Sequence, residues 1–179
     1  MPSFHTVRRV AYPPSAMLDL VADVARYPEF VPLCENLKVM SRADGPEGVS
    51  TIVARMTVGY GPIHESFTSK VVVAKSALRI DVTYLDGPFR SLRNRWLFKP
   101  AADPAQGACD VDFDIVYEFR SLPLQLLLGA MFDRAFRKFA EAFEARAAKI
   151  YGAPQSSPPA ARSVENKSPD GPTALRPAR

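Results

Sequence analysis

Near its C-terminal end, the chain joins a strictly alternating segment to a long amphipathic one. Residues 111–119, VDFDIVYEF, alternate apolar and mostly polar side chains, which predicts a β-strand with one buried face. Residues 122–151 repeat apolar side chains at helical spacing, and at 1.5 Å per residue this helix would be roughly 45 Å long. A helix of that length needs a broad sheet to cover its apolar side. We therefore expect a curved sheet that holds one long helix, with a packed core or an apolar cavity between them.

The segments before this unit predict more strands and two short helices. After a first strand, Pro13 and Pro14 start a helix whose apolar residues fall at i, i+3, i+4 and i+7. Residues 27–32, YPEFVP, break that helix and predict one further short turn. Hairpin-sized turns between the later strands indicate an antiparallel meander. The expected fold class is α+β, a curved antiparallel sheet of about seven strands at residues 3–11, 33–40, 51–59, 63–74, 78–84, 92–98 and 111–119.

The composition changes sharply at Gly152. Six of the seventeen prolines fall within residues 153–179, where large apolar side chains are almost absent. This predicts one folded domain at residues 1–152 and a disordered Pro-rich tail at residues 153–179. The whole chain carries a net charge of +4, and the tail holds four basic and two acidic residues, which leaves +2 on the domain. A domain so close to neutral argues against DNA binding.

The chain offers few residues for metal binding or secretion. Its only histidines are His5 and His64, and its two cysteines, Cys34 and Cys109, form no CxxC pair, so no zinc pattern can be assembled. Free cysteines fit a reducing compartment. The N-terminus lacks the apolar run of a signal peptide, and no apolar run approaches the ~20 residues of a membrane span. We expect a cytoplasmic protein, in contact with the inner membrane at most from its surface.

One arginine interrupts the apolar side of the long helix. Ser121 is the expected N-cap and Gly152 the expected end. Arg146 falls inside the apolar arc, where it either pairs with a carboxylate such as Asp23 or contacts a polar ligand group. The phenylalanines on this arc fit a packed core and a lipid-lined tunnel equally well. At 100° per residue the arc spans roughly 140° and contains residues 124, 128, 131, 132, 135, 136, 139, 142, 143 and 150.

Several segments together resemble a known family. They are Tyr12-Pro13, LVADV at 20–24 with YPEFVPLC at 27–34, DGPF at 86–89 with Leu92, Trp96 and Phe98, and AFEARA at 142–147 with Tyr151-Gly152. In this order and spacing, residues 3–152 resemble the coenzyme Q-binding START-like proteins. That group belongs to the polyketide cyclase/dehydrase superfamily, which also includes a bacterial ribosome-association toxin.

The resemblance implies a fold, a ligand and a role. The fold would be the helix-grip of START and Bet v 1-like proteins, with an apolar tunnel between sheet and helix. The role would be non-enzymatic: binding ubiquinone or a related polyprenyl lipid in support of respiration, with no other cofactor. The toxin branch implies an alternative, in which the protein associates with the ribosome and interferes with subunit association.

The inward register of the strands and helix selects candidate ligand contacts. A quinone needs hydrogen-bond donors for its carbonyls, and Tyr84, Asn94 and Tyr117 are inward donors, although each could equally satisfy a core hydrogen bond. Arg146 is the charged option. The remaining tunnel candidates are apolar: Met56, Val58, Phe67, Val71, Ile80, Val82, Trp96, Ile115, Phe132, Phe136 and Phe139.

Two predicted loops carry apolar side chains that would reach a membrane. They place Phe30 and Val31 in one loop and Phe89 beside Arg90 in the other. Transient contact with an anionic membrane would let a lipid enter the tunnel, whereas loops folded over the sheet would not.

An enzyme such as a cyclase is the less favoured alternative. His64 and Glu65 are adjacent in a strand, so their side chains point to opposite faces and cannot act as a pair. Asp110, Asp112 and Asp114 share one strand face, which is either a solvated outer face or a divalent-metal site. The sequence provides no catalytic set, and we expect no enzymatic activity.

Overall fold

The computed structural model describes residues 1–103 and 107–153. Residues 154–179, which make up nearly all of the predicted disordered tail, lie outside the described residues. The chain begins with strand β1 (Ser3–Val10), helix α1 (Pro14–Ala22) and a short 3-10 helix, η1 (Val24–Glu29). It continues with β2 (Cys34–Asp44), the single turn η2 (Pro46–Gly48), β3 (Val49–Tyr60), β4 (Ile63–Ala74), β5 (Arg79–Asp86), β6 (Phe89–Pro100), β7 (Cys109–Phe119) and α2 (Leu122–Tyr151).

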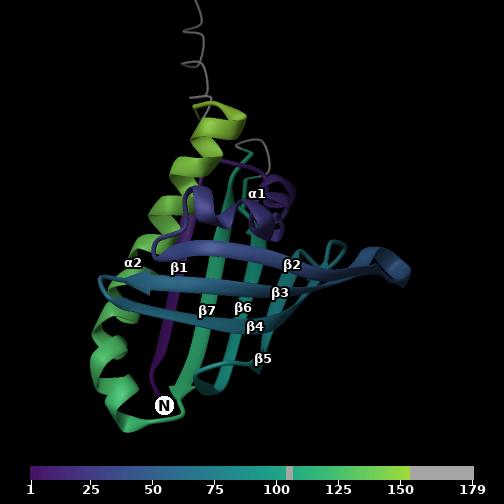
Figure 1. Ribbon diagram of the computed structural model, residues 1–179. Helices are drawn as coiled ribbons and strands as arrows, with labels where there is room; N and C mark the ends of the chain where they lie inside the picture. The colour runs from purple at the N-terminus through teal and green to yellow at the C-terminus, as the bar shows by residue number, and fades with distance from the viewer. Residues whose placement is uncertain (104–106, 154–179) are drawn as a thin grey trace, which may run out of the picture.

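The seven strands form one antiparallel sheet in the order β1-β7-β6-β5-β4-β3-β2. Strands β2 to β7 are a meander, and β1 pairs with β7, so the first and last strands lie side by side. The sheet curves around the long helix α2, and α1 covers one end of the sheet (Figure 1). The α+β architecture that the sequence pattern predicted, and the helix-grip fold that the family resemblance implied, are confirmed.

Helix α2 occupies the residues that the sequence predicted. Its N-cap is Ser121, whose side chain accepts a hydrogen bond from the Leu124 backbone N–H at 3.4 Å, and Pro123 lies in the first turn. The helix ends at Gly152, which has a φ of 84°. Among the described helices, none is long and apolar enough to cross a membrane.

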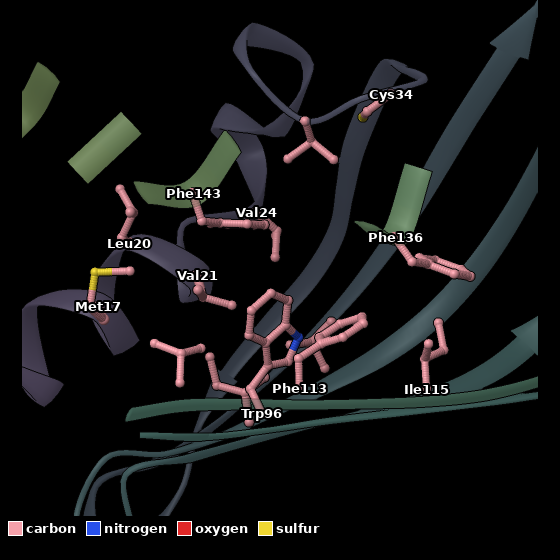
Figure 2. Close-up of a cluster of buried hydrophobic side chains, with 14 of the residues drawn as sticks. Met17, Leu20, Val21, Val24, Cys34, Trp96, Phe113, Ile115, Phe136 and Phe143 are labelled. Carbon is pink, nitrogen blue, oxygen red and sulfur yellow. The ribbon is translucent and has the colours of Figure 1, made fainter. Parts of the chain in front are cut away.

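The core lies between the inner face of the sheet and α2. Alternate residues of β7 from Cys109 to Phe119 are buried, as the sequence pattern predicted. In the close-up of Figure 2, Trp96 and Phe113 project from the strands toward Phe136 and Phe143 of α2. Buried residues of α1 close the same core from one end: Met17, Leu18, Leu20 and Val21.

Strand β2 extends beyond its predicted end. The apolar pattern stops at Met40, but the strand continues to Asp44 because residues 41–44 stay paired with residues 50–53 of β3. These last residues are exposed, so backbone hydrogen bonding rather than burial holds them in the sheet.

Candidate functional site

A cavity of about 110 Å³ lies between the sheet and α2. Its wall is almost wholly apolar. The lining residues with polar side-chain atoms are Tyr27, Ser69, Asn94 and Trp96. None of the lining residues is an Asp, Glu, His, Lys or Arg. The others are Val24, Val31, Pro32, Leu33, Leu37, Ala54, Met56, Val58, Phe67, Val71, Ile80, Val82, Leu92, Phe113, Ile115, Phe132, Ala135, Phe136, Phe139 and Phe143.

Most of the predicted tunnel residues lie on this wall. The ones that do are Met56, Val58, Phe67, Val71, Ile80, Val82, Asn94, Trp96, Ile115, Phe132, Phe136 and Phe139. The inward register of β3 to β7 and the apolar arc of α2 were enough to select them, because a concave sheet directs every second side chain toward the helix.

Three predicted contacts, Tyr84, Tyr117 and Arg146, are not on the wall. Tyr84 lies beyond the cavity against Phe89, with ring centroids 5.8 Å apart, and its buried hydroxyl has no hydrogen-bond partner among the described residues. The Tyr117 hydroxyl donates to Asp133 at 3.4 Å. Burial, with Asp133 nearby, raises the pKa of Tyr117 to about 12, so the phenol stays neutral. Inward register placed both tyrosines in the core but could not distinguish the cavity from the packing around it.

Arg146 pairs with Glu29, not with Asp23 as the sequence suggested. Its Nη2 donates to Glu29 Oε2 at 2.7 Å, and its guanidinium lies 5.1 Å from the centre of the Phe30 ring. The side chain is 12% exposed, and its buried Nε has no partner among the described residues. The two guanidinium groups of Arg26 and Arg146 lower the pKa of Glu29.

This pair fastens a short segment over the cavity. We call residues 24–33 the cover, because several of them line the cavity. They are Val24, Tyr27, Val31, Pro32 and Leu33. Tyr27 and Phe30 both meet the edge of Phe143 on α2, with ring centroids 5.5 and 5.1 Å apart. The cover is therefore held to α2 by aromatic packing and by the Arg146–Glu29 ion pair.

Asn94 is largely committed to the structure. Its Nδ2 donates to the Asp114 carbonyl at 3.0 Å, and its Oδ1 accepts from Trp96 Nε1 at 2.8 Å. One hydrogen on Nδ2 remains for a ligand.

Ser69 is a polar wall residue that sequence reasoning missed. It lies on β4 between Ala54 and Tyr84 of the neighbouring strands, is 7% exposed, and has no side-chain hydrogen bond among the described residues. The available signal was a serine at an inward position, between Phe67 and Val71.

The structure corrects the predicted membrane loops. Phe89 is fully buried, because β6 already begins there and turns its ring inward, 4.7 Å from that of Phe119. Val31 is buried and lines the cavity. Phe30 is half-buried under Arg146, and only Arg90 is exposed, where it pairs with Glu118 at 3.1 Å.

The acidic row on β7 lies on the outer face, where two of its three carboxylates, Asp110 and Asp112, are paired with basic side chains. Arg9 binds both oxygens of Asp110 at 2.7 and 2.8 Å, and Lys99 and His5 contact Asp112 at 2.8 and 2.9 Å. These hydrogen bonds lower the pKa of both carboxyls. Within the described parts of the chain, no group of three or more His, Cys, Asp or Glu residues could hold a metal ion.

Burial keeps both cysteine thiols protonated. It raises the pKa of Cys34 and of Cys109 to about 11, with Asp110 adding to the effect at Cys109. A neutral thiol is a weak nucleophile, so neither side chain is poised for covalent chemistry.

The sequence relatives include a ribosome association toxin and a coenzyme Q-binding protein. The chain is 33% identical over 141 residues to the ribosome association toxin RatA of Pseudomonas aeruginosa, covering 79% of this chain and 92% of the relative. It is 34% identical over 137 residues to the mitochondrial coenzyme Q-binding protein COQ10 homolog B of Xenopus laevis, covering 76% of this chain and 54% of that longer protein.

Solved structures share the fold. The 18 kDa protein CC1736 of Caulobacter crescentus is 36% identical, with a TM-score of 0.69 over 86% of this chain and all of that one. The Zhui aromatase/cyclase of a Streptomyces species has a TM-score of 0.71 at 16% identity over 87% of this chain and 99% of its own. A START superfamily protein of Mycobacterium smegmatis has a TM-score of 0.65 at 17% identity over 83% and 98%. The last two likenesses concern the fold alone.

A family model covers α1, the cover, strands β2 to β7 and most of α2. It matches residues 10–144, about three quarters of the chain, and its description is polyketide cyclase/dehydrase and lipid transport. The chain belongs to this polyketide cyclase/dehydrase and lipid transport family.

Proposed function

We propose that this protein binds ubiquinone or a related polyprenyl lipid in the cavity between the sheet and α2, and so supports respiratory electron transport as a quinone chaperone or carrier. The observation that carries the proposal is the apolar wall, which has no charged side chain and only four residues with polar atoms. Burying an isoprenoid chain against such a wall is favourable by about 25 cal/mol per Å² of apolar area. The similarity to a protein named for coenzyme Q binding supports the same ligand class.

The size of the cavity bears on how such a lipid would enter. Small-molecule pockets usually measure roughly 300–1,000 Å³, and an apolar cavity of about 150 Å³ admits benzene. The 110 Å³ present here has room for part of an isoprenoid chain or much of a ring. A whole lipid would require the cover to move away from α2. The cover is the natural part to move, since it is short and its contacts with α2 include the Arg146–Glu29 ion pair and two aromatic rings.

Two wall groups could recognise the quinone carbonyls. Ser69 has a hydroxyl without a partner among the described residues, and Asn94 retains one amide hydrogen. Donors in an otherwise apolar pocket would orient the headgroup and discriminate a quinone from a plain hydrocarbon.

We further propose that binding involves no chemistry on the ligand and no additional cofactor. General acid–base catalysis requires a titratable group within reach of the ligand, and the cavity wall has no carboxylate, imidazole or amine. Its one phenol, Tyr27, donates to the Val21 carbonyl, and burial raises the pKa of this phenol. A cyclase-like activity is the weaker alternative. The structural likeness to an aromatase/cyclase extends to the fold and leaves this point to experiment.

The lipid ligand suggests where the protein works. A carrier of a membrane lipid must meet the membrane to load and unload, and we propose a cytoplasmic protein that touches the inner membrane transiently. The loop residues first expected to touch the membrane do not offer a free apolar surface, because Val31 and Phe89 are buried and Arg90 is paired with Glu118.

The outer face of the sheet favours ribosome association as a second candidate function. Lys70 on β4 and Arg93 on β6 are both registered with Thr83 on β5, and neither has a carboxylate partner among the described residues. Arg93 also lines an open depression of about 320 Å³, together with Arg79, Arg95 and the carboxylates of Asp81 and Asp114. Free basic side chains of this kind bind RNA phosphates in a salt-dependent manner, and the relatives named RatA support this role.

The test of lipid binding is extraction of the purified protein from quinone-containing cells, followed by mass spectrometry. Lipid binding predicts a near-stoichiometric polyprenyl quinone. Phe139→Lys would place a charge on the wall and should abolish it, because burying an unpaired charge is very costly. Ala135→Leu, which fills the cavity without a charge, should do the same if Phe139→Lys is unfolded.

Ala145→Leu, on the exposed side of α2, is the matched control and should retain the lipid. A wild-type protein that carries no lipid from quinone-replete cells would contradict the proposal. Ribosome association is tested separately by sedimentation of ribosomal subunits with the wild type and with Lys70→Gln/Arg93→Gln. Unchanged subunit association at every protein and salt concentration would remove that second candidate.

A further inference from the structure

An apolar surface lies outside the cavity, at the first turns of α2. Leu122, Leu126 and Leu127 are 70%, 74% and 60% exposed, so most of each side chain meets solvent. We call these three residues the leucine tip. Pro123 and Ala130, on the same side of the helix, are also exposed. Three exposed leucines within six residues expose more apolar surface than isolated surface residues normally do.

The tip is held rigidly by the end of the sheet. Arg120 donates its backbone N–H to the Pro88 carbonyl at 2.9 Å and its Nε to the Phe89 carbonyl at 3.0 Å. The next residue, Ser121, caps the helix. Figure 1 shows this end of α2 beside the N-terminus, where the helix leaves the sheet. The direction in which the leucines project is therefore fixed by the fold, and they cannot turn inward to join the core.

Basic residues follow the leucines on the same side of α2. Leu126, Ala130, Arg134 and Lys138 form a row four residues apart, and Arg137 lies next to it. All three basic side chains are exposed, and none forms an ion pair with a described residue. At 1.5 Å per residue, Arg134 lies roughly 12 Å behind Leu126 along the axis. We call Arg134, Arg137 and Lys138 the basic row.

The leucine tip, followed along α2 by the basic row, matches the change from acyl chains to charged headgroups at a membrane surface. Interfacial helices bury leucines about 5–10 Å into the boundary of headgroups and acyl chains, with Lys and Arg at the headgroups. A second copy of the chain fits less well, because apposed tips would bring two basic rows together. An anionic membrane satisfies both the leucines and the cations.

We propose that the leucine tip and the basic row dock this protein on membranes that contain anionic lipid. The choice of a membrane as partner rests on the proposed lipid-binding function, although the surface itself lies outside the cavity. Docking there places the start of α2 against the lipid. Phe132, a cavity wall residue on the opposite side of the helix, follows Leu127 by roughly 7.5 Å along the axis. The part of α2 that lines the cavity therefore begins close to the docked membrane surface.

The test is co-sedimentation of the full chain with phosphatidylcholine vesicles, with and without phosphatidylglycerol, and without quinone. Binding should require the anionic lipid and weaken as salt is added. Leu126→Ser/Leu127→Ser should weaken it at least ten-fold, since each leucine would lose a buried site. Arg134→Gln/Lys138→Gln should weaken it by about five-fold for each charge removed.

Matched controls come from the far end of the same helix. Ile150→Ser removes an apolar side chain that is 50% exposed, and Lys149→Gln removes an exposed charge, so both should bind vesicles like the wild type. Equal binding by the leucine variant and Ile150→Ser would overturn the proposal. So would leucine-dependent self-association, seen by sedimentation velocity, without any binding to vesicles.

Lipid extraction separates this proposal from the proposed function. Wild-type protein that carries quinone but ignores anionic vesicles would overturn the docking surface and leave lipid binding intact. Protein that binds vesicles through the leucine tip but never carries a lipid would support the surface and contradict lipid binding in the cavity.

Discussion

Arg146 near the end of α2 donates a hydrogen bond to Glu29 at the end of η1, with Nη2 and Oε2 2.7 Å apart, although 116 residues separate them in the chain. This ion pair joins the cover to the helix that forms one wall of the cavity. Because Glu29 also accepts from Arg26 at 2.9 Å, one carboxylate receives two guanidinium groups of very different burial. The two arginines therefore form a natural matched pair for experiment.

Arg146→Ala should loosen the cover. The variant loses a largely buried side chain that stacks on Phe30, and we expect a loss of about 1–2 kcal/mol in the free energy of unfolding. Arg26→Ala removes an exposed partner of the same carboxylate and should cause no measurable loss. Urea titration gives the free energies, and hydrogen exchange at residues 27–33 reports the cover directly. Equal exchange in the two variants would show that Arg146 does not fasten it.

The attachment of the cover should weaken in acid. The hydrogen bonds from Arg26 and Arg146 lower the pKa of Glu29 below its ordinary value of 4.5. A lowered folded-state pKa contributes stability that is fully present above 4.5 and is lost as the pH falls through the folded value. The hydrogen-exchange protection of the cover, which is its exchange rate relative to the intrinsic rate at the same pH, should thus fall below pH 4.5 in the wild type.

Glu29→Gln should remove that acid-dependent step. Asp110 and Asp112 also have lowered pKa values and would still reduce global stability in acid, so the comparison must be made at the cover. A cover whose exchange changes with pH in the same way in wild type and Glu29→Gln would contradict the assignment.

Ser69→Ala should separate headgroup recognition from burial of the tail. Losing one hydrogen bond costs about 0.5–1.5 kcal/mol, so quinone affinity should fall roughly two- to ten-fold. Affinity for an isoprenoid alcohol without the quinone ring should stay unchanged. Ser91→Ala is the control, since it also removes a buried hydroxyl without a partner but lies outside the cavity wall. Parallel loss of both ligands in Ser69→Ala would indicate a packing change instead.

Tyr84→Phe should stabilise the protein slightly. Its buried hydroxyl has no partner among the described residues, so the substitution removes a desolvated polar group without leaving a cavity. We expect a gain of up to about 1 kcal/mol in the free energy of unfolding. Tyr117→Phe, which breaks a hydrogen bond to Asp133, should show no such gain. Urea titration of both variants decides the matter, and a destabilised Tyr84→Phe would mean that the hydroxyl has a partner.

Local patterns predicted the fold because they were strong and consistent along the chain. The alternation in β7 fixed which side chains face inward, and Ser121 and Gly152 fixed the ends of α2. The inward register of the strands together with the apolar arc of α2 located half of the residues on the cavity wall. Where the pattern faded, at Ser41 to Asp44, the strand continued through backbone pairing that side chains do not report.

Contacts between distant segments were the part that the sequence could not supply. The sequence suggested Asp23 as the carboxylate partner of Arg146, and only the position of the cover against α2 identified Glu29. Phe89 follows a turn motif, and its burial depends on β6 beginning one residue after Pro88. The leucine tip did leave a signal, because Leu122, Leu126 and Leu127 fall outside the predicted apolar arc of the helix.

The most direct measurement of lipid binding uses Trp96, the only tryptophan in the chain and a residue of the cavity wall. Its fluorescence would be followed while a short-chain ubiquinone is added to delipidated protein, with Ala135→Leu and Ala145→Leu in parallel. A quinone bound in the cavity would quench Trp96 saturably in wild type and Ala145→Leu, and much less in Ala135→Leu. Quenching that never saturates, and that is the same in all three proteins, would contradict quinone binding between the sheet and α2.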